Sequence, residues 1–194
     1  MLTSQLIETP VGTMTAIAAD RGLVLFEFSG PRRLPGQLAR VRTLFGQTPE
    51  PGEHTFLAQT RVELDEYFAG RRKEFTIPLV IAGTPFQESV WRELLRIPFG
   101  STVSYHQIAT RIGRPGSARA VGRANGDNRI AIIIPCHRVI GSNGSLTGYG
   151  GGEPNKRWLL DHEARDRHPE DPERSERDEG SAFQPMYRTG ETVR

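Results

Sequence analysis

The sequence predicts a small α/β region, an antiparallel sheet with helices, followed by a mainly α-helical region that contains a helix-turn-helix. The first half of the chain has short β-prone runs separated by turn residues, a pattern typical of an antiparallel meander. The second half has helix-capping patterns and a short glycine-containing turn between two helices, which indicates a helix-turn-helix. We therefore expect an α/β scaffold domain over 1–82, a helical domain over 83–164 and a charged tail over 165–194.

Three strands and one helix are expected in the first region. The β-prone runs cover 5–9, 13–19 and 23–29, with turns between them. Apolar residues at helical spacing predict a helix over 56–68 that stops at Gly70. Because no pattern in this region indicates chemistry, we expect it to serve as a scaffold.

The second region contains two capping boxes, the side-chain pattern that marks the start of a helix. Thr84 and Ser104 each precede a glutamine by three residues, which predicts a helix start at both positions. A third helix is expected to begin at a Ser117 cap, and a last helix to cover 154–163. Before that last helix, the apolar run 130–134 is expected to be buried and extended.

Positive charge is concentrated in the helical region. Residues 84–164 hold ten Lys and Arg against six Asp and Glu, whereas residues 1–83 hold nine of each. This distribution is expected of a protein with a polyanion partner, although a solvated basic face explains it equally well. The tail, 165–194, begins with a run of both charge signs that is nearly free of apolar residues. We expect this tail to be disordered.

Composition narrows the class of protein. The longest apolar run is far too short to cross a bilayer, and the N-terminus lacks the basic and apolar segments of a secretory signal. A single cysteine excludes an internal disulfide and a multi-cysteine zinc site. We expect a cytoplasmic protein without a membrane partner, associated with the nucleoid if its source is bacterial.

The single cysteine is the first candidate for chemistry. Cys136 follows Pro135 and precedes His137 and Arg138. Positive neighbours favour the thiolate, which is the nucleophilic form, whereas a lone cysteine is also a common small buried hydrophobe. Neighbours in an extended chain point to opposite faces, so a direct contact between Cys136 and His137 is not implied. The residues alone leave both interpretations open.

The expected third helix is the second candidate. Arg119 and Arg123 lie four residues apart and share one face of it, and small residues between them make the helix slim. A slim helix with an arginine suits close approach to a backbone or a minor groove better than major-groove reading. Tight packing of two helices explains the small residues as well. The glycine-rich stretch 145–152 lacks the spacing of a phosphate-binding loop and is expected to close over a ligand.

Seven motifs then occur in order along the chain. They are Gly83-Thr-Pro-Phe-Gln87, Ile97-Pro-Phe-Gly100, Ser104-Tyr105, Ala118-Arg-Ala-Val-Gly122, Ala124-Asn125, Ile134-Pro-Cys-His-Arg-Val-Ile140 and Leu146-Thr-Gly-Tyr-Gly-Gly151. As an ordered set they resemble the O6-alkylguanine-DNA alkyltransferase (methylated-DNA–protein-cysteine methyltransferase) family. The resemblance is dense over 83–163, weak before it, and does not extend into the tail.

The resemblance implies a role for each matching residue. Cys136 would accept the alkyl group, His137 would activate it through a water, and Glu163 would orient His137. Tyr105 would help to rotate the nucleotide out and protonate the departing guanine, and Asn128 would shape the turn between the recognition helix and an active-site strand. The residues implied in DNA binding are Ser104, Tyr105, Ala118, Arg119 and Arg123, with Arg119 filling the vacated space in the base stack. The implied pocket residues are Pro135, Val139, Tyr149 and Gly150, the last standing where some relatives have serine.

The implied activity is DNA repair by stoichiometric transfer of an alkyl (methyl) group from O6-alkylguanine to Cys136. Such a protein acts once, because its thioether product has no hydrolysable acyl carbon, and it needs no cofactor or metal. The implied partner is double-stranded DNA containing O6-alkylguanine, bound by a monomer through the minor groove with the damaged base flipped out. Two rivals are a non-catalytic alkyltransferase-like lesion-binding protein, which replaces the acceptor cysteine, and a cysteine hydrolase, which turns over and needs an oxyanion hole.

Overall fold

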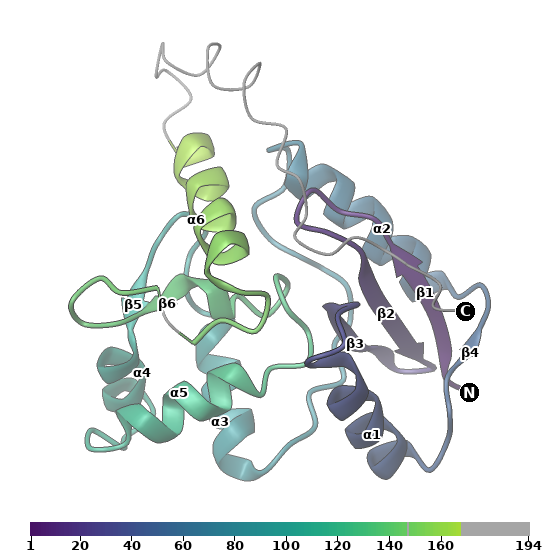
Figure 1. The fold of residues 1–194 in the computed structure, drawn as a ribbon, viewed down its shortest axis with the longest axis horizontal. Helices are drawn as coiled ribbons and strands as arrows, with labels where there is room; N and C mark the ends of the chain where they lie inside the picture. The colour runs from purple at the N-terminus through teal and green to yellow at the C-terminus, as the bar shows by residue number, and fades with distance from the viewer. Residues whose placement is uncertain (147, 168–194) are drawn as a thin grey trace, which may run out of the picture.

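The computed structural model describes residues 1–146 and 148–167, which form an α/β unit beside a helical unit (Figure 1). The strands are β1 (Thr3–Ile7), β2 (Met14–Ala19), β3 (Gly22–Phe28), β4 (Glu50–Pro51), β5 (Val103–Ser104) and β6 (Val139–Ile140). The helices are α1 (Leu34–Phe45), α2 (Thr55–Phe68), α3 (Pro85–Leu94), α4 (Tyr105–Arg111), α5 (Ala118–Gly126) and α6 (Glu153–Arg167), with a 3-10 turn, η1 (Cys136–Arg138). The predicted fold class is confirmed.

The N-terminal sheet is mixed, with the strand order β3-β2-β1-β4. Strands β1, β2 and β3 form the antiparallel meander that the sequence predicts. The prediction of a purely antiparallel sheet is wrong at one edge, because the short strand β4 pairs parallel with β1. β4 is two residues long and ends in a proline, so it carries no alternating pattern by which to be found.

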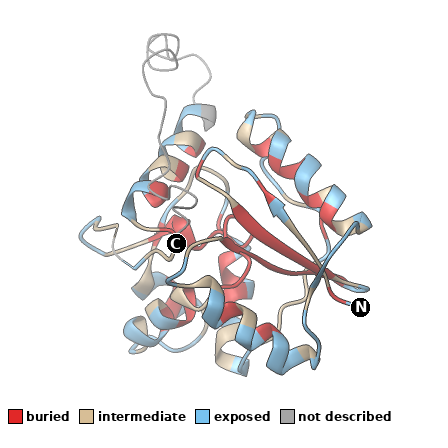
Figure 2. Ribbon diagram, turned by 45° about the vertical axis from the view of Figure 1, so that its right-hand side comes forward, coloured by how far each residue is buried: buried red, intermediate tan, exposed pale blue. Residues whose placement is uncertain are grey.

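Helices pack on both faces of this sheet. On one face α2 contributes Leu57, Leu64 and Tyr67 to a core that also contains residues of the helical unit. On the other face α1, which was not predicted, packs Val41 into a smaller core that includes Ile17. Because both faces are covered, β2 and β3 are buried almost throughout (Figure 2), as is typical of strands enclosed by helices.

The helix-turn-helix consists of α4 and α5, which pack against each other and against α3. The capping boxes predicted at Thr84 and Ser104 are both present. The predicted cap at Ser117 is wrong, because its side chain makes no capping hydrogen bond. Between the two helices, Gly113 has a φ of 71°, a conformation that glycine adopts without steric cost.

The apolar run 130–134 is buried, but the prediction that it is extended is wrong. Its residues turn instead of forming a strand, and Ile132 has a φ of 68°. The run is held by the edge of β3, since the Phe26 amide donates to the Arg129 carbonyl at 2.8 Å and the Ala131 amide to the Phe26 carbonyl at 2.7 Å. The N-terminal sheet thus hydrogen-bonds directly to the segment that leads to Cys136.

The last helix is longer than predicted. α6 continues through Arg167, so the first three residues of the predicted tail, 165–167, are helical. The remainder of that tail, 168–194, lies outside the described residues, and so does the prediction that it is disordered. Within 1–146 and 148–167, every helix is too short or too polar to cross a membrane.

Candidate active site

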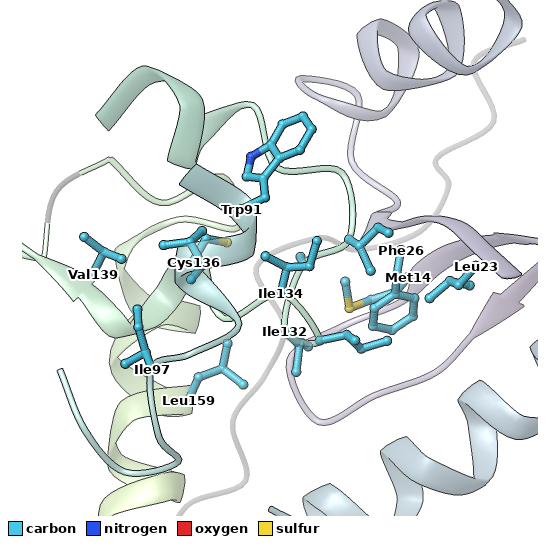
Figure 3. Packing of buried hydrophobic residues seen from close by; sticks show 14 of the residues in the cluster. Met14, Leu23, Phe26, Trp91, Ile97, Ile132, Ile134, Cys136, Val139 and Leu159 are labelled. Atoms are coloured by element: carbon cyan, nitrogen blue, oxygen red, sulfur yellow. The ribbon is translucent and has the colours of Figure 1, made fainter. Parts of the chain in front are cut away.

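Cys136 is the first residue of η1 and lies in the interior of the protein. Its exposed fraction is 5%, and it packs among apolar side chains such as Trp91 and Val139 (Figure 3). Pro135 precedes it with a ψ of 63°, so the chain bends into a tight turn at the cysteine. The expectation of an extended chain at Cys136 is therefore wrong, and its neighbour His137 need not point to the opposite face.

Burial dominates the ionisation of the Cys136 thiol. The pKa is raised to about 11, chiefly by burial and in smaller part by the Glu27 carboxylate. A side-chain hydrogen bond from Asn128 and the charges of Arg33 and Lys156 act in the opposite direction. The expectation that neighbouring positive charge favours the thiolate is thus outweighed by desolvation. At neutral pH this cysteine is a thiol and must lose its proton to become a nucleophile.

His137 is oriented to accept that proton. Its Nε2 lies 2.8 Å from Glu163 Oε1, and both side chains are fully buried. Burial lowers the pKa of His137 despite the adjacent carboxylate, so the imidazole is neutral. The hydrogen bonds from His137 and Arg138, together with the charge of Arg138, outweigh desolvation and lower the pKa of Glu163. A carboxylate only accepts, which makes Nε2 the donor and leaves Nδ1 as the basic nitrogen.

The second ring nitrogen of His137, Nδ1, lies in the turn that also carries Cys136. Nδ1 is buried and forms no hydrogen bond with the described residues. Buried polar atoms are normally hydrogen-bonded, and η1 puts this residue next to Cys136 in a tight turn. The His137 ring is therefore fixed by Glu163 through Nε2, and its Nδ1 forms no hydrogen bond with the described residues.

Glu163 accepts hydrogen bonds from four directions. Oε1 accepts from the Tyr67 hydroxyl at 2.8 Å and from His137. Oε2 accepts from the Gly100 amide at 3.0 Å and from Arg138 Nε at 2.9 Å. Arg138 is anchored in turn by the Ile97 carbonyl at 2.7 Å. Neither Tyr67 nor Arg138 was assigned a role from the sequence, although a tyrosine in an apolar helix stripe is a signal, because its hydroxyl needs a partner when buried.

Asn128 braces the turn that carries the cysteine. Its amide Nδ2 donates to the Ile134 carbonyl at 2.9 Å, and its Oδ1 accepts from the Ile130 amide at 3.0 Å. The Asn128 carbonyl accepts from Arg33 Nη2 at 3.3 Å, and Arg33 also forms an ion pair of 2.9 Å with the buried Glu27. Asn128 therefore lies in a turn after α5, as the resemblance implied, but the segment that follows turns instead of forming a strand.

Tyr105 and the helix-turn-helix line an open groove of about 520 Å³. The described residues that line it include Tyr105, Ala118, Arg119 and Gly148. Ser104 caps α4 at the same end. Burial and, to a smaller extent, the charge of Cys136 raise the pKa of Tyr105. Arg119 and Arg123 are both exposed on α5.

The glycine-rich loop packs against the N-terminal unit. The ring of Tyr149 meets Phe28 edge to face, with centroids 5.9 Å apart. Burial and the nearby Cys136 raise the pKa of Tyr149 well above its usual range. A Cβ atom added to Gly150 would lie 2.4 Å from Cζ of Arg33, and one added to Gly151 would lie 2.4 Å from the ring of Phe28. Arg33 thus occupies the space that a serine side chain would need at position 150.

Comparisons with known proteins agree with this architecture. Residues 2–81 match the family description "6-O-methylguanine DNA methyltransferase, ribonuclease-like domain", and residues 85–165 match its "DNA binding domain". A methylated-DNA–protein-cysteine methyltransferase of Mycobacterium tuberculosis is 48% identical over 163 residues, which are 84% of this chain and 93% of the relative. One from Shigella flexneri is 56% identical over 102 residues, 52% of this chain and 60% of the relative.

Solved structures give the same result. The O6-methylguanine methyltransferase of Mycobacterium tuberculosis superposes with a TM-score of 0.74 and 44% identity, covering 86% of this chain and 94% of that one. The structure of that organism's protein in complex with DNA superposes with a TM-score of 0.72 and 43% identity, covering 84% and 94%. The buried cysteine and the adjacent helix-turn-helix together define a transferase that acts on DNA. The chain belongs to the 6-O-methylguanine DNA methyltransferase family.

Proposed function

We propose that this protein repairs DNA by direct reversal, moving the alkyl group of O6-alkylguanine to Cys136 and acting once. The observation that carries the proposal is the arrangement of Cys136, His137 and Glu163. A buried thiol with a pKa of about 11 is followed by a neutral histidine. The Glu163 carboxylate binds Nε2 of that histidine and leaves Nδ1 as the basic nitrogen. The alternative, a non-catalytic lesion-binding protein, is not favoured, because such a protein replaces the acceptor cysteine and this chain has Cys136 at that position.

The reaction follows from these groups. The Cys136 proton passes to Nδ1 of His137, through a water as the family resemblance implies, and Glu163 stabilises the imidazolium that forms. The thiolate sulfur then attacks the alkyl carbon. A carbon–sulfur bond forms, the bond from that carbon to O6 breaks, and its electron pair stays on the guanine. Tyr105, which reaches from the groove towards the thiol, supplies a proton to the departing guanine.

The base must leave the duplex for this attack to occur. Cys136 is buried and, among the described residues, does not line the open groove, whereas Arg119 does. A base-modifying protein extrudes its target nucleotide at a cost of a few kcal/mol, on the order of one stacking interaction. We assign Arg119 to the vacated space in the stack and Arg123 to a phosphate, with α5 in the minor groove.

The pocket for the extruded base is assigned to the segment around the thiol. Pro135 and Val139 flank the turn and are buried, and we assign Tyr149 and Gly150 of the glycine-rich loop to the same pocket. The partner is double-stranded DNA that contains O6-alkylguanine, and the protein acts as a monomer in the cytoplasm, on the nucleoid in a bacterium.

Mass spectrometry of the intact protein tests the proposal. Mixing the protein with a duplex that contains O6-methylguanine should add one methyl group per molecule, located at Cys136 by peptide mapping. Cys136→Ser should bind the duplex and gain no mass. Methyl transfer to the Cys136→Ser protein, or more than one repaired base per wild-type molecule, would exclude the proposed reaction and favour a different nucleophile or a hydrolase.

A second measurement separates extrusion from chemistry. Arg119→Ala should slow repair of the duplex much more than reaction with free O6-methylguanine base, because a free base needs no flipping. Arg123→Ala, on the same face of α5, is the matched control: at saturating duplex it should not separate the two substrates, because it weakens binding and not extrusion. Equal loss on duplex and free base would assign Arg119 to the pocket instead of the base stack.

A further inference from the structure

Lys156 is a fully buried charged residue that the relay of His137 and Glu163 does not use. It lies in the second turn of α6, and its exposed fraction is 0%. Moving an ammonium group out of water costs several kcal/mol unless the protein returns an equivalent interaction. Lysine is among the residue types that are almost never fully buried. Its position therefore requires an explanation in terms of what its charge does.

The contacts of Lys156 point to the cysteine turn. Its Nζ donates to the Val139 carbonyl at 2.6 Å. The Val139 amide in turn donates to the Cys136 carbonyl, which closes η1. The ammonium thus holds the end of the turn whose first residue carries the thiol. A neutral donor would hold the same carbonyl without the cost of burying a charge.

The charge of Lys156 acts on the thiol. Cys136 is the largest electrostatic influence that raises the pKa of Lys156, against desolvation that lowers it, and Lys156 lowers the pKa of Cys136. Glu153 also raises the pKa of Lys156, and this exposed carboxylate forms an ion pair of 3.1 Å with Arg157.

Before the thiol proton is transferred, the other groups around Cys136 are compensated or uncharged, and the neutral His137 imidazole is among them. From the N-terminal unit, Glu27 on β3 raises the thiol pKa and Arg33 lowers it. The two residues form an ion pair of 2.9 Å, so their opposite effects on the thiol offset each other. From α4 and the glycine-rich loop, Tyr105 and Tyr149 contribute phenols whose raised pKa keeps them neutral.

We propose that Lys156 is a positioning residue that supplies the countercharge for the Cys136 thiolate while fixing the Val139 carbonyl at the end of η1. The proposal rests on the proposed alkyl transfer. Once the thiol proton has passed to His137, negative charge resides on sulfur. During transfer that charge moves through the forming carbon–sulfur bond and the breaking bond to O6 onto the guanine. An ammonium held at the Val139 carbonyl, at the end of the turn that begins with Cys136, stabilises the charge before it moves.

The pH dependence of thiol alkylation by iodoacetamide tests the proposal without DNA or a methylated base. Because the chain has one cysteine, carbamidomethylation followed by intact mass reports Cys136 alone. Lys156→Met removes the charge and the donor, Lys156→Gln removes the charge and keeps a donor for the Val139 carbonyl, and Lys156→Arg keeps the charge. Arg157→Met, on the exposed face of α6, is the matched control.

Lys156→Met and Lys156→Gln should raise the apparent thiol pKa by about one unit, so that the rate below the pKa falls about tenfold. Lys156→Arg and Arg157→Met should follow the wild-type profile. If Lys156→Met fails to fold, the folded Lys156→Gln protein decides. An unchanged profile in Lys156→Gln would overturn the proposal and leave Lys156 as a hydrogen-bond donor only. Failure of the proposed alkyl transfer appears separately, as a wild-type protein that reacts with iodoacetamide but gains no methyl group from DNA.

Discussion

The two halves of the molecule differ in how much of their function can be recognised from sequence motifs. The helical unit carries every recognised motif, the cysteine and the excess positive charge. The N-terminal unit carries no such motif, yet its side chains reach the site at three points. Tyr67 binds Glu163, Arg33 binds the Asn128 carbonyl, and Phe28 packs on the glycine-rich loop.

This difference separates two kinds of functional residue. Residues that touch the substrate are restricted in type by chemistry, and they produce motifs. Residues that hold those groups in place are restricted by geometry, which many sequences can satisfy. The comparison predicts that substitutions in the helical unit remove the reaction, whereas those in the N-terminal unit weaken it by displacing groups that remain present.

The largest effect is expected from Glu163→Gln. The substitution leaves Arg138 buried with its carboxylate replaced by an amide, a loss that costs about 3–5 kcal/mol when one partner of a buried pair is removed. An amide has one acceptor oxygen where the carboxylate has two, so His137 on one side or Gly100 and Arg138 on the other must lose an acceptor. Both the alkyl-transfer rate and the free energy of unfolding should therefore fall. Chemical denaturation and single-turnover transfer measure the two quantities. Glu153→Gln, an exposed carboxylate on the same helix, should change neither.

A smaller effect, at the contact between the two units, is expected from Gly151→Ala. The added Cβ would lie 2.4 Å from the Phe28 ring, and overpacking of this kind costs about 1–3 kcal/mol. The displaced loop should slow transfer, and the double variant Phe28→Leu with Gly151→Ala should recover part of the loss. Gly36→Ala, where nothing lies within 4 Å, is the control. Strict additivity in the double-mutant cycle would contradict the direct contact.

Tyr67→Phe tests the N-terminal unit alone and should have an effect similar in size to that of Gly151→Ala. Removing the hydroxyl takes one hydrogen bond from the Glu163 carboxylate, which is worth about 1.5–3 kcal/mol for a charged acceptor. Alkyl transfer should slow while affinity for undamaged duplex stays unchanged. Thr60→Val on the same helix also deletes a buried hydroxyl, but one that binds the Phe56 carbonyl. If both variants slow transfer equally, Tyr67 acts through general stability and the proposed coupling between the units is absent.

The sequence predicted elements best where local rules determine them. The capping boxes at Thr84 and Ser104 need only residues three apart, and both are present. Helix α1 was missed although Leu34, Leu38, Val41 and Phe45 repeat at helical spacing, because Pro35 and Gly36 in its first turn are typical of loops. The run 130–134 was expected to be extended because apolar content indicates burial and not conformation.

The site was predicted unevenly for the same reason. Sequence neighbours and motif matches identified Cys136, His137 and Glu163. The direction of the thiol pKa was missed, because it depends on how deeply the cysteine is buried and not on which residues adjoin it. Tyr67 lies 96 residues before Glu163, and no local pattern connects residues at that separation.

The smallest effect is expected from Arg123→Ala, and it sharpens the comparison by testing DNA contact alone. Arg123 is exposed on α5, four residues after Arg119, and is assigned to a phosphate. Each lost phosphate contact lowers the slope of log affinity against log salt by about one unit, with little change at the reacting atoms. Tyr67→Phe should leave this slope unchanged, because the N-terminal unit is assigned no phosphate, and Arg157→Ala controls for the loss of an exposed arginine elsewhere. Titration of a labelled duplex over several salt concentrations gives all three slopes. A lower slope in Tyr67→Phe would mean that the N-terminal unit also shapes the DNA-binding surface. The assignment of DNA contact to the helical unit alone would then be wrong.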